Sequence, residues 1–163
     1  MIIVDSSTLI LLAKSGMLDI MLNNLKEQLT ISKTVCIEAT IKNELFDAKL
    51  IKERINEGKI KVKEISNNKI YKKLLKDFNI GEGEAQSIAL CLENKVPLIA
   101  DDKKAINCCR ILNIRFITAL NLLVRLYKTQ KISKAVVENI LKKLQFYGRY
   151  DDKIIQKIKE EIK

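Results

Sequence analysis

Short apolar segments alternate with helical segments along the whole chain, and this alternation limits the fold more than any other feature. The first segment, residues 1–5, is a run of apolar residues that ends in Asp5. Later segments with a strand-like pattern are residues 29–32, 59–65, 96–100 and 114–118, and helical patterns lie between them. Strands that alternate with helices predict an α/β fold, in which helices cover both faces of a parallel sheet of about five strands.

The length of 163 residues fits one domain with one sizeable core. Five Gly and one Pro leave little material for long loops, so we expect helices with short connections. Two helical segments close the chain, with Gly148 as the break between them, and we treat residues 133–163 as a helical element appended to the single domain 1–163. No apolar run reaches about 18 residues, which predicts a cytoplasmic protein without a membrane segment.

The chain contains no His and four Cys, and these counts exclude several kinds of site. Without His there is no Ser-His-Asp or Cys-His triad. The four Cys do not form a C-x-x-C motif, which argues against a structural zinc site. Each lies in an apolar helical context, so we expect free, buried thiols; they are Cys36, Cys91, Cys108 and Cys109.

Acidic residues recur where strands end or helices begin. Asp5 follows the first strand and the pair Asp101-Asp102 follows the fourth, while Glu38 lies on the helix after the second; Glu82 and Glu84 open a helix in mid-chain. The carboxyl ends of parallel strands meet in a crevice where the strand order reverses. Carboxylates gathered there would repel each other unless a cation neutralised them, and Mg²⁺ and Mn²⁺ prefer such oxygen ligands. The pattern therefore predicts an acidic metal site.

Each acid alone also has a structural interpretation. An acid at a helix start can cap the helix or interact with its dipole, and Glu38 can simply face solvent. Two other acidic folds fit less well: a receiver domain would carry its acidic pair after the first strand, and a haloacid-dehalogenase-type phosphatase would carry D-x-D where this chain has Asp5-Ser6-Ser7. No phosphate-binding P-loop is present.

The net charge of +10 is concentrated in the second part of the chain. Residues 101–163 hold 15 Lys and Arg against 7 Asp and Glu. Cations that hold phosphates beside carboxylates that hold a metal are typical of a metal-dependent nuclease. Lysine-rich helices facing solvent give the same composition, so charge alone does not decide between the two interpretations.

Taken together, these residues resemble the PIN-domain family of nucleases over nearly the whole chain. The similar motifs are IVDSS (3–7), VCIE (35–38), GEGEAQSIAL (81–90), LIADDKKA (98–105) and FYGRY (146–150). The resemblance implies a three-layer α/β/α sandwich with strand order 3-2-1-4-5. Many members are VapC-like toxins of toxin–antitoxin pairs, which implies RNA, a cognate antitoxin and a second copy of the chain as partners.

The resemblance also implies roles for particular residues. The catalytic acids would be Asp5, Glu38, Glu84 and Asp102. The metal ligands would be Asp5, Asp102, Glu84 and Asp101, with Asp102 a closer match than Asp101 because a basic residue follows it directly. Ser7 and Glu82 would support the site, and the RNA-binding residues would be Lys103, Lys104, Arg110 and Arg115.

The function implied is a metal-dependent endoribonuclease that uses Mg²⁺ or Mn²⁺ to hydrolyse RNA phosphodiester bonds. The alternative is a non-catalytic PIN-fold module that binds RNA or a partner protein without cutting.

Overall fold

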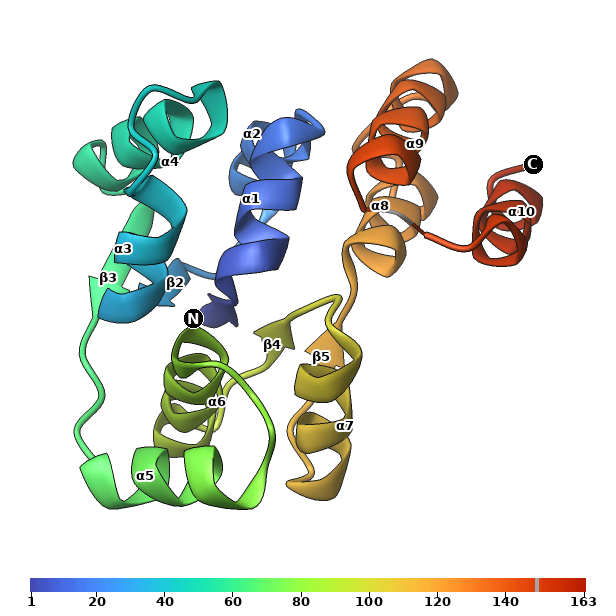
Figure 1. Cartoon of the computed structure of the whole chain (residues 1–163). Helices are drawn as coiled ribbons and strands as arrows, with labels where there is room; N and C mark the ends of the chain where they lie inside the picture. Colours follow the sequence, from blue (N-terminus) through green and yellow to red (C-terminus); the bar gives the residue numbers. More distant parts are fainter. Residues whose placement is uncertain (149) are drawn as a thin grey trace.

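A computed structural model describes residues 1–148 and 150–163, so Arg149 of the FYGRY motif lies outside the described residues. Five strands form one parallel sheet in the order β3-β2-β1-β4-β5 (Figure 1). The strands are β1 (Ile2–Val4), β2 (Leu29–Ser32), β3 (Ile60–Lys63), β4 (Leu98–Ile99) and β5 (Phe116–Ile117). The α/β class and the strand order are both as predicted.

Helices fill the connections between the strands and complete the C-terminal end. They are α1 (Ser6–Lys14), α2 (Met17–Asn24), α3 (Lys33–Thr40), α4 (Phe46–Asn56), α5 (Asn68–Asp77), α6 (Glu82–Asn94), α7 (Lys103–Ile111), α8 (Ala119–Lys128), α9 (Lys134–Gly148) and α10 (Asp152–Glu161). In Figure 1, α1 to α4 lie above the sheet and α5 to α7 lie below it.

The residues of β1 alternate between the two sides of the sheet, as the period of a strand requires. Ile2 and Val4 belong to a core cluster with α1, α2 and α4, whereas Ile3 belongs to a second cluster with α6 and α7. Ile3 and Val4 are fully buried, because β1 is the central strand of a three-layer α/β/α sandwich. Two apolar layers thus fix the strand whose end carries Asp5.

One helix start differs from what residue type alone suggests. Thr34 is a capping residue by type, but the hydroxyl of Ser32 accepts the hydrogen bond from Val35 N at 3.1 Å and caps the helix that carries Glu38. The break expected at Gly148 is confirmed, since Gly148 is the last residue of α9 and α10 begins at Asp152. The strand-like segment 59–65 contains β3, an edge strand in which only Ile60 is buried.

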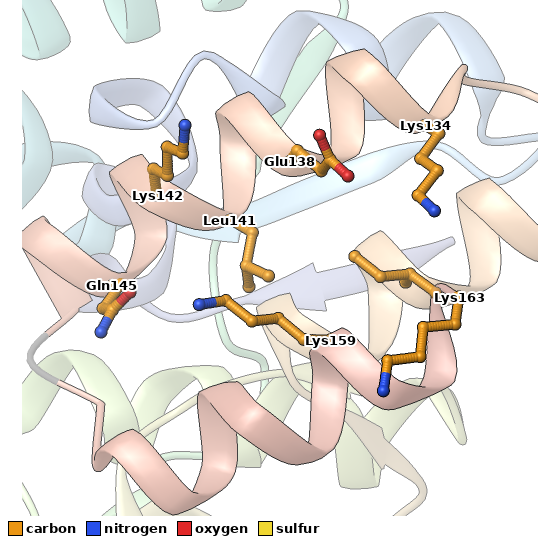
Figure 2. Close-up of a pocket in the computed structure, with 8 residues that line it drawn as sticks. Lys134, Glu138, Leu141, Lys142, Gln145, Lys159 and Lys163 are labelled. Carbon is orange, nitrogen blue, oxygen red and sulfur yellow. The ribbon is translucent and has the colours of Figure 1, made fainter.

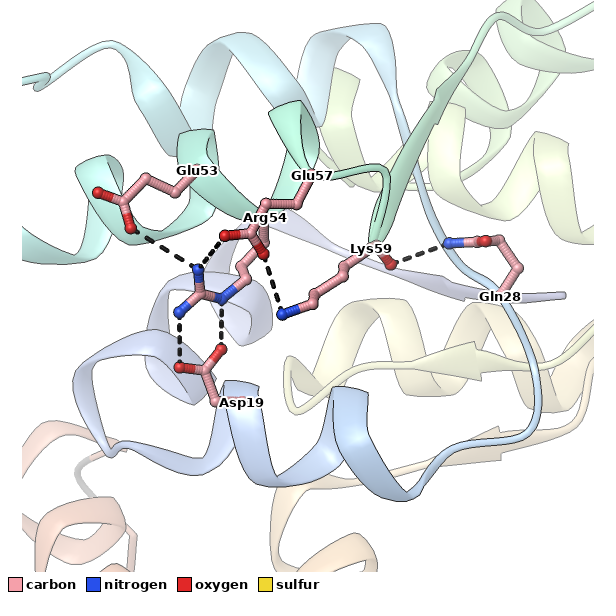
Figure 3. Close-up of polar contacts among 6 residues, drawn as sticks. All are labelled: Asp19, Gln28, Glu53, Arg54, Glu57 and Lys59. Atoms are coloured by element: carbon pink, nitrogen blue, oxygen red, sulfur yellow. Dashed lines mark hydrogen bonds and ion pairs between the residues drawn. The ribbon is translucent and has the colours of Figure 1, made fainter.

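One ionic cluster ties α2 to α4 (Figure 3). The guanidinium of Arg54 donates to both carboxylate oxygens of Asp19, at 2.6 and 2.9 Å, and also to Glu57 at 3.0 Å. This pairing lowers the pKa of Asp19 and raises that of Arg54. Lys59 closes the cluster at the start of β3 through Glu57 at 2.9 Å.

The C-terminal helices pack on the domain through apolar side chains. Val137 and Leu144 of α9 and Ile155 of α10 belong to the core cluster that contains α1 and α8. Gln145 of α9 donates to Asp152 of α10 at 3.1 Å, so the two helices are joined near their turn. No helix within the described residues is long and apolar enough to span a bilayer.

Candidate metal centre

Asp5 lies where β1 passes into α1, and it is the cap residue of that helix. Its Oδ1 accepts from Thr8 N at 2.8 Å and from the Ser7 hydroxyl at 3.3 Å. Both donors act on the same oxygen, so Oδ2 is buried without a hydrogen-bond partner among the described residues. Asp5 is only 1% exposed, and a buried carboxylate oxygen without a partner is unfavourable unless something else binds it.

Asp101 is brought beside Asp5 by the pairing of β1 with β4. Val4 is in register with Ile99, and Asp5 N donates to the Ile99 carbonyl at 3.3 Å. Thr8 links the two acids, because its backbone N–H donates to Asp5 while its hydroxyl accepts from Asp101 N at 3.0 Å. These strands lie where the strand order reverses, which is the crevice expected in such a sheet.

The carboxylate of Asp101 is held by two donors from distant parts of the chain. Ala119 N, at the start of α8, donates to Oδ2 at 3.1 Å, and the Tyr150 hydroxyl donates to Oδ1 at 2.9 Å. A carboxylate oxygen can accept more than one bond, so each still has capacity for a cation.

Burial is the largest cause of the raised pKa values of Asp5 and Asp101. The pKa of Asp5 is raised from 3.8 to about 6, mainly by desolvation and to a lesser extent by the negative charges of Asp101 and Glu84. Hydrogen bonds from Thr8 oppose the rise. Burial also raises the pKa of Asp101, against the bonds from Ala119 and Tyr150. Negative charge is therefore concentrated at this point of the sheet.

Two predicted acids approach from α3 and α6. Glu84 lies near enough to Asp5 to raise its pKa, but its Oε2 accepts from Gly81 N at 2.8 Å and so caps α6. Glu38 is exposed on α3, and its carboxylate lies against Gly83 of α6: a Cβ on that glycine would come within 2.9 Å of Glu38 Cδ and Oε1. The bare backbone at Gly83 is what admits Glu38.

Asp102 and Glu82 have local roles. Asp102 caps α7, since its Oδ1 accepts from Lys104 N at 2.8 Å and from Ala105 N at 3.0 Å. Glu82 is exposed in the first turn of α6. Of the adjacent pair, Asp101 is thus the one whose charge acts on Asp5.

The predicted RNA-binding residues lie on and after α7. All four are exposed, and the guanidinium of Arg110 also lies 5.6 Å from the ring centroid of Phe116; the four are Lys103, Lys104, Arg110 and Arg115. A separate basic groove of about 300 Å³ lies between α9 and α10 (Figure 2). Its lining includes Lys134, Lys142, Lys159 and Lys163, none of which the sequence analysis selected.

The donor set fits a hard divalent cation, although it is not gathered into a closed cage. Among the described residues, no three acidic or thiol side chains already surround a point where a metal could sit. A cation would provide a partner for Oδ2 of Asp5, which has no hydrogen bond among the described residues. It would also neutralise the nearby charges of Asp101 and Glu84, which raise the pKa of Asp5. Oxygen-only ligands and a partly open shell suit Mg²⁺ and Mn²⁺, which keep several waters.

Sequence reasoning missed the groups that orient these acids. Thr8 could have been found as the residue three after Asp5, the usual partner of a helix cap. Tyr150 lies in a motif that the sequence analysis used, but nothing local connects it to Asp101. The four thiols are free, as expected, and those of Cys91, Cys108 and Cys109 are buried.

A parallel sheet of this order, with carboxylates at its central switch point, defines a PIN-like α/β/α protein with a nuclease-like fold. The family model described as DUF3368, PIN domain, matches residues 1–163, so the chain belongs to this PIN-domain family.

A solved structure has a similar fold. It is a PilT N-terminus domain protein from the archaeon Sulfolobus solfataricus, to which the chain is similar with a TM-score of 0.52 and 20% identity. The match covers 89% of this chain and 95% of the archaeal one. No curated protein matches the sequence.

Proposed function

We propose that this protein is an endoribonuclease that depends on Mg²⁺ or Mn²⁺ and hydrolyses phosphodiester bonds in RNA. The observation that carries the proposal is the buried, unpaired Oδ2 of Asp5 beside Asp101, at the carboxyl ends of β1 and β4. A chain gains nothing in stability from such an oxygen, so its presence favours a role in binding a cation.

Asp5, Asp101 and Glu84 would hold the ion, with Asp102 and Glu38 at the border of the site. When bound, Mg²⁺ or Mn²⁺ lowers the pKa of water and stabilises charge on a phosphate. The chain itself contributes orientation: Thr8 and Ser7 fix Oδ1 of Asp5 so that Oδ2 stays available. Burial of Asp5 excludes bulk water and strengthens its attraction for a cation.

The cationic flank supplies attraction for the RNA backbone. Lys103 and Lys104 directly follow Asp102 at the start of α7, and both are exposed. Their charges would hold phosphates beside the acids, and binding would weaken as salt is raised. From the family resemblance we further propose a toxin that acts as a homodimer in the cytoplasm and is silenced by a cognate antitoxin.

The second candidate is a PIN-fold module that binds RNA or protein without cutting. It is favoured by the capping bonds of Glu84 and Asp102, which use carboxylates that catalysis would need. Those bonds must be shared or exchanged if these acids are to act on a metal.

One comparison separates the two candidates. The purified protein should cut single-stranded RNA with Mn²⁺ or Mg²⁺ and lose this activity in EDTA and in the Asp5→Asn variant. Asp77→Asn, at an exposed position on α5, is the matched control and should cut like the wild type. RNA that is bound but left intact by the wild type, with equal binding by Asp5→Asn, would support the binding module instead.

A further inference from the structure

Tyr150, which lies between α9 and α10, reaches the acidic crevice. Its hydroxyl donates to Oδ1 of Asp101 at 2.9 Å, over a separation of 49 residues in the chain. The other oxygen of this carboxylate accepts from Ala119 N. Tyr150 therefore supplies one of the two groups that fix the Asp101 carboxylate.

The ring of Tyr150 is itself held in place by the shape of the backbone. A Cβ at Gly148 would lie 2.9 Å from Tyr150 Cδ2 and 3.0 Å from Cζ, closer than carbon atoms pack. Glycine at this position leaves room for the ring, so Gly148 and Tyr150 form one unit. Gly148 ends α9, as expected, and its lack of a side chain also leaves room for this ring.

From this geometry, we propose that Tyr150 is a positioning residue, which orients Asp101 toward a divalent cation shared with Asp5. The proposal rests on the metal-dependent function proposed above and adds the C-terminal helices to its site. A residue that hydrogen-bonds a ligand fixes its direction, and loss of such a bond typically reduces metal affinity or activity about 10- to 100-fold. Without Tyr150, the carboxylate of Asp101 would keep only its bond from Ala119 N.

The direct test is Tyr150→Phe, which removes the hydroxyl and leaves the ring. Binding of Mn²⁺ to full-length protein is measured by electron paramagnetic resonance, independently of cleavage. We expect Mn²⁺ affinity to fall about 10-fold or more, with the KM for RNA at saturating metal unchanged. Tyr127→Phe on α8 is the control, since no hydrogen bond of that hydroxyl occurs among the described residues, and it should bind Mn²⁺ like the wild type.

A second variant tests whether Gly148 affects Mn²⁺ affinity through the position of the Tyr150 ring. Gly148→Ala should displace the ring and lower Mn²⁺ affinity, but it should add little in a Tyr150→Phe background, because the bond is already lost. If Tyr150→Phe melts at a lower temperature but binds Mn²⁺ within twofold of the wild type, the tyrosine is only structural and the proposal is wrong.

The test of Tyr150 and the test of nuclease activity can fail independently. A wild type that binds Mn²⁺ but leaves RNA intact would refute the nuclease, while the comparison of metal affinities would still decide the role of Tyr150. A wild type that binds no Mn²⁺ would overturn the positioning role together with the metal site.

Discussion

Asp5 should destabilise the metal-free protein at neutral pH, and replacing it with Asn should therefore stabilise the fold. The carboxylate is 1% exposed, and burial raises its pKa from 3.8 to about 6. One pKa unit corresponds to about 1.4 kcal/mol, so charging Asp5 in the folded state costs about 3 kcal/mol at most. Asn keeps an oxygen that can accept from Thr8 N, so the cap of α1 is retained.

The sign of the pH dependence follows from the raised pKa. Well below the unfolded pKa of 3.8, Asp5 is protonated in both the folded and unfolded states, and its favourable contribution is fully present. As pH rises from about 4 to about 6, the unfolded state releases this proton before the folded state does, so stability is lost, and the loss is complete once the pH exceeds the folded pKa. We expect Asp5→Asn to differ from the wild type by less than about 1 kcal/mol at pH 4 and to be about 1–3 kcal/mol more stable at pH 7.5.

Urea denaturation followed by circular dichroism in EDTA, from pH 4 to 7.5, measures this difference. The Asp77→Asn variant controls for charge removal at an exposed site. Mn²⁺ at about 1,000 times its Kd should reverse the order, since it stabilises the protein that binds it by about 4.1 kcal/mol, more than the expected difference. An Asp5→Asn protein that is less stable than the wild type at pH 7.5, or equally different at every pH, would refute this reasoning.

Two further substitutions test single contacts. Gly83→Ala should push the Glu38 carboxylate away from α6 and slow RNA cleavage about 10-fold. The free energy of unfolding should rise by up to about 1 kcal/mol, because alanine favours a helix more than glycine does. In a Glu38→Ala background Gly83→Ala should no longer slow cleavage, and an undiminished effect there would exclude Glu38 as the cause of the slower cleavage. Arg54→Ala should destabilise the fold by about 1 kcal/mol, because the pair with Asp19 is partly exposed. Since the pKa of Asp19 is lowered, that loss should be measurable in urea at pH 7 and disappear as pH falls below the lowered value; a loss independent of pH would mean that packing, not charge, sets it.

The strand positions could be predicted from apolar or alternating segments, and the strand order from the resemblance to the PIN-domain family. The first residue of a helix was harder to predict, because it depends on which of two nearby hydroxyls accepts a hydrogen bond from the free backbone N–H groups of the first turn. Ser32 and Thr34 are both good caps by type, and only the backbone at the end of β2 selects Ser32. The boundary errors are therefore local, and none of them moves an acid away from its strand.

The positions of the acids were predictable, but their directions were not. Asp101 and Asp102 are adjacent, and the pattern favoured Asp102 because a basic residue follows it. In the structure Asp102 caps α7, whereas the carboxylate of Asp101 accepts from Ala119 and Tyr150, and its backbone N–H donates to Thr8. Partners from separate segments of the chain decide which of the two side chains points inward, and no local motif contains that information.

Glu84 offers a way to separate capping from metal binding, because the carboxylate that caps α6 is also one of the proposed metal ligands. Its Oε2 accepts from Gly81 N at 2.8 Å, an interaction that an amide oxygen can also make. Glu84→Gln should therefore keep the cap and leave the free energy of unfolding within about 0.5 kcal/mol of the wild type. Mn²⁺ affinity, measured by electron paramagnetic resonance, should nevertheless fall about 10-fold, because the charge near Asp5 is removed.

Glu82→Gln is the matched control, since Glu82 is exposed and lies in the same first turn of α6 as Glu84. It removes the same charge from the first turn of α6, so a general effect of net charge or of the helix dipole would appear equally in both variants. Equal Mn²⁺ affinities in the two variants would exclude a specific role for Glu84. A loss of Mn²⁺ affinity in Glu84→Gln alone, with the free energy of unfolding unchanged, would mean that the negative charge of Glu84 serves cation binding and that the cap to Gly81 N does not require it.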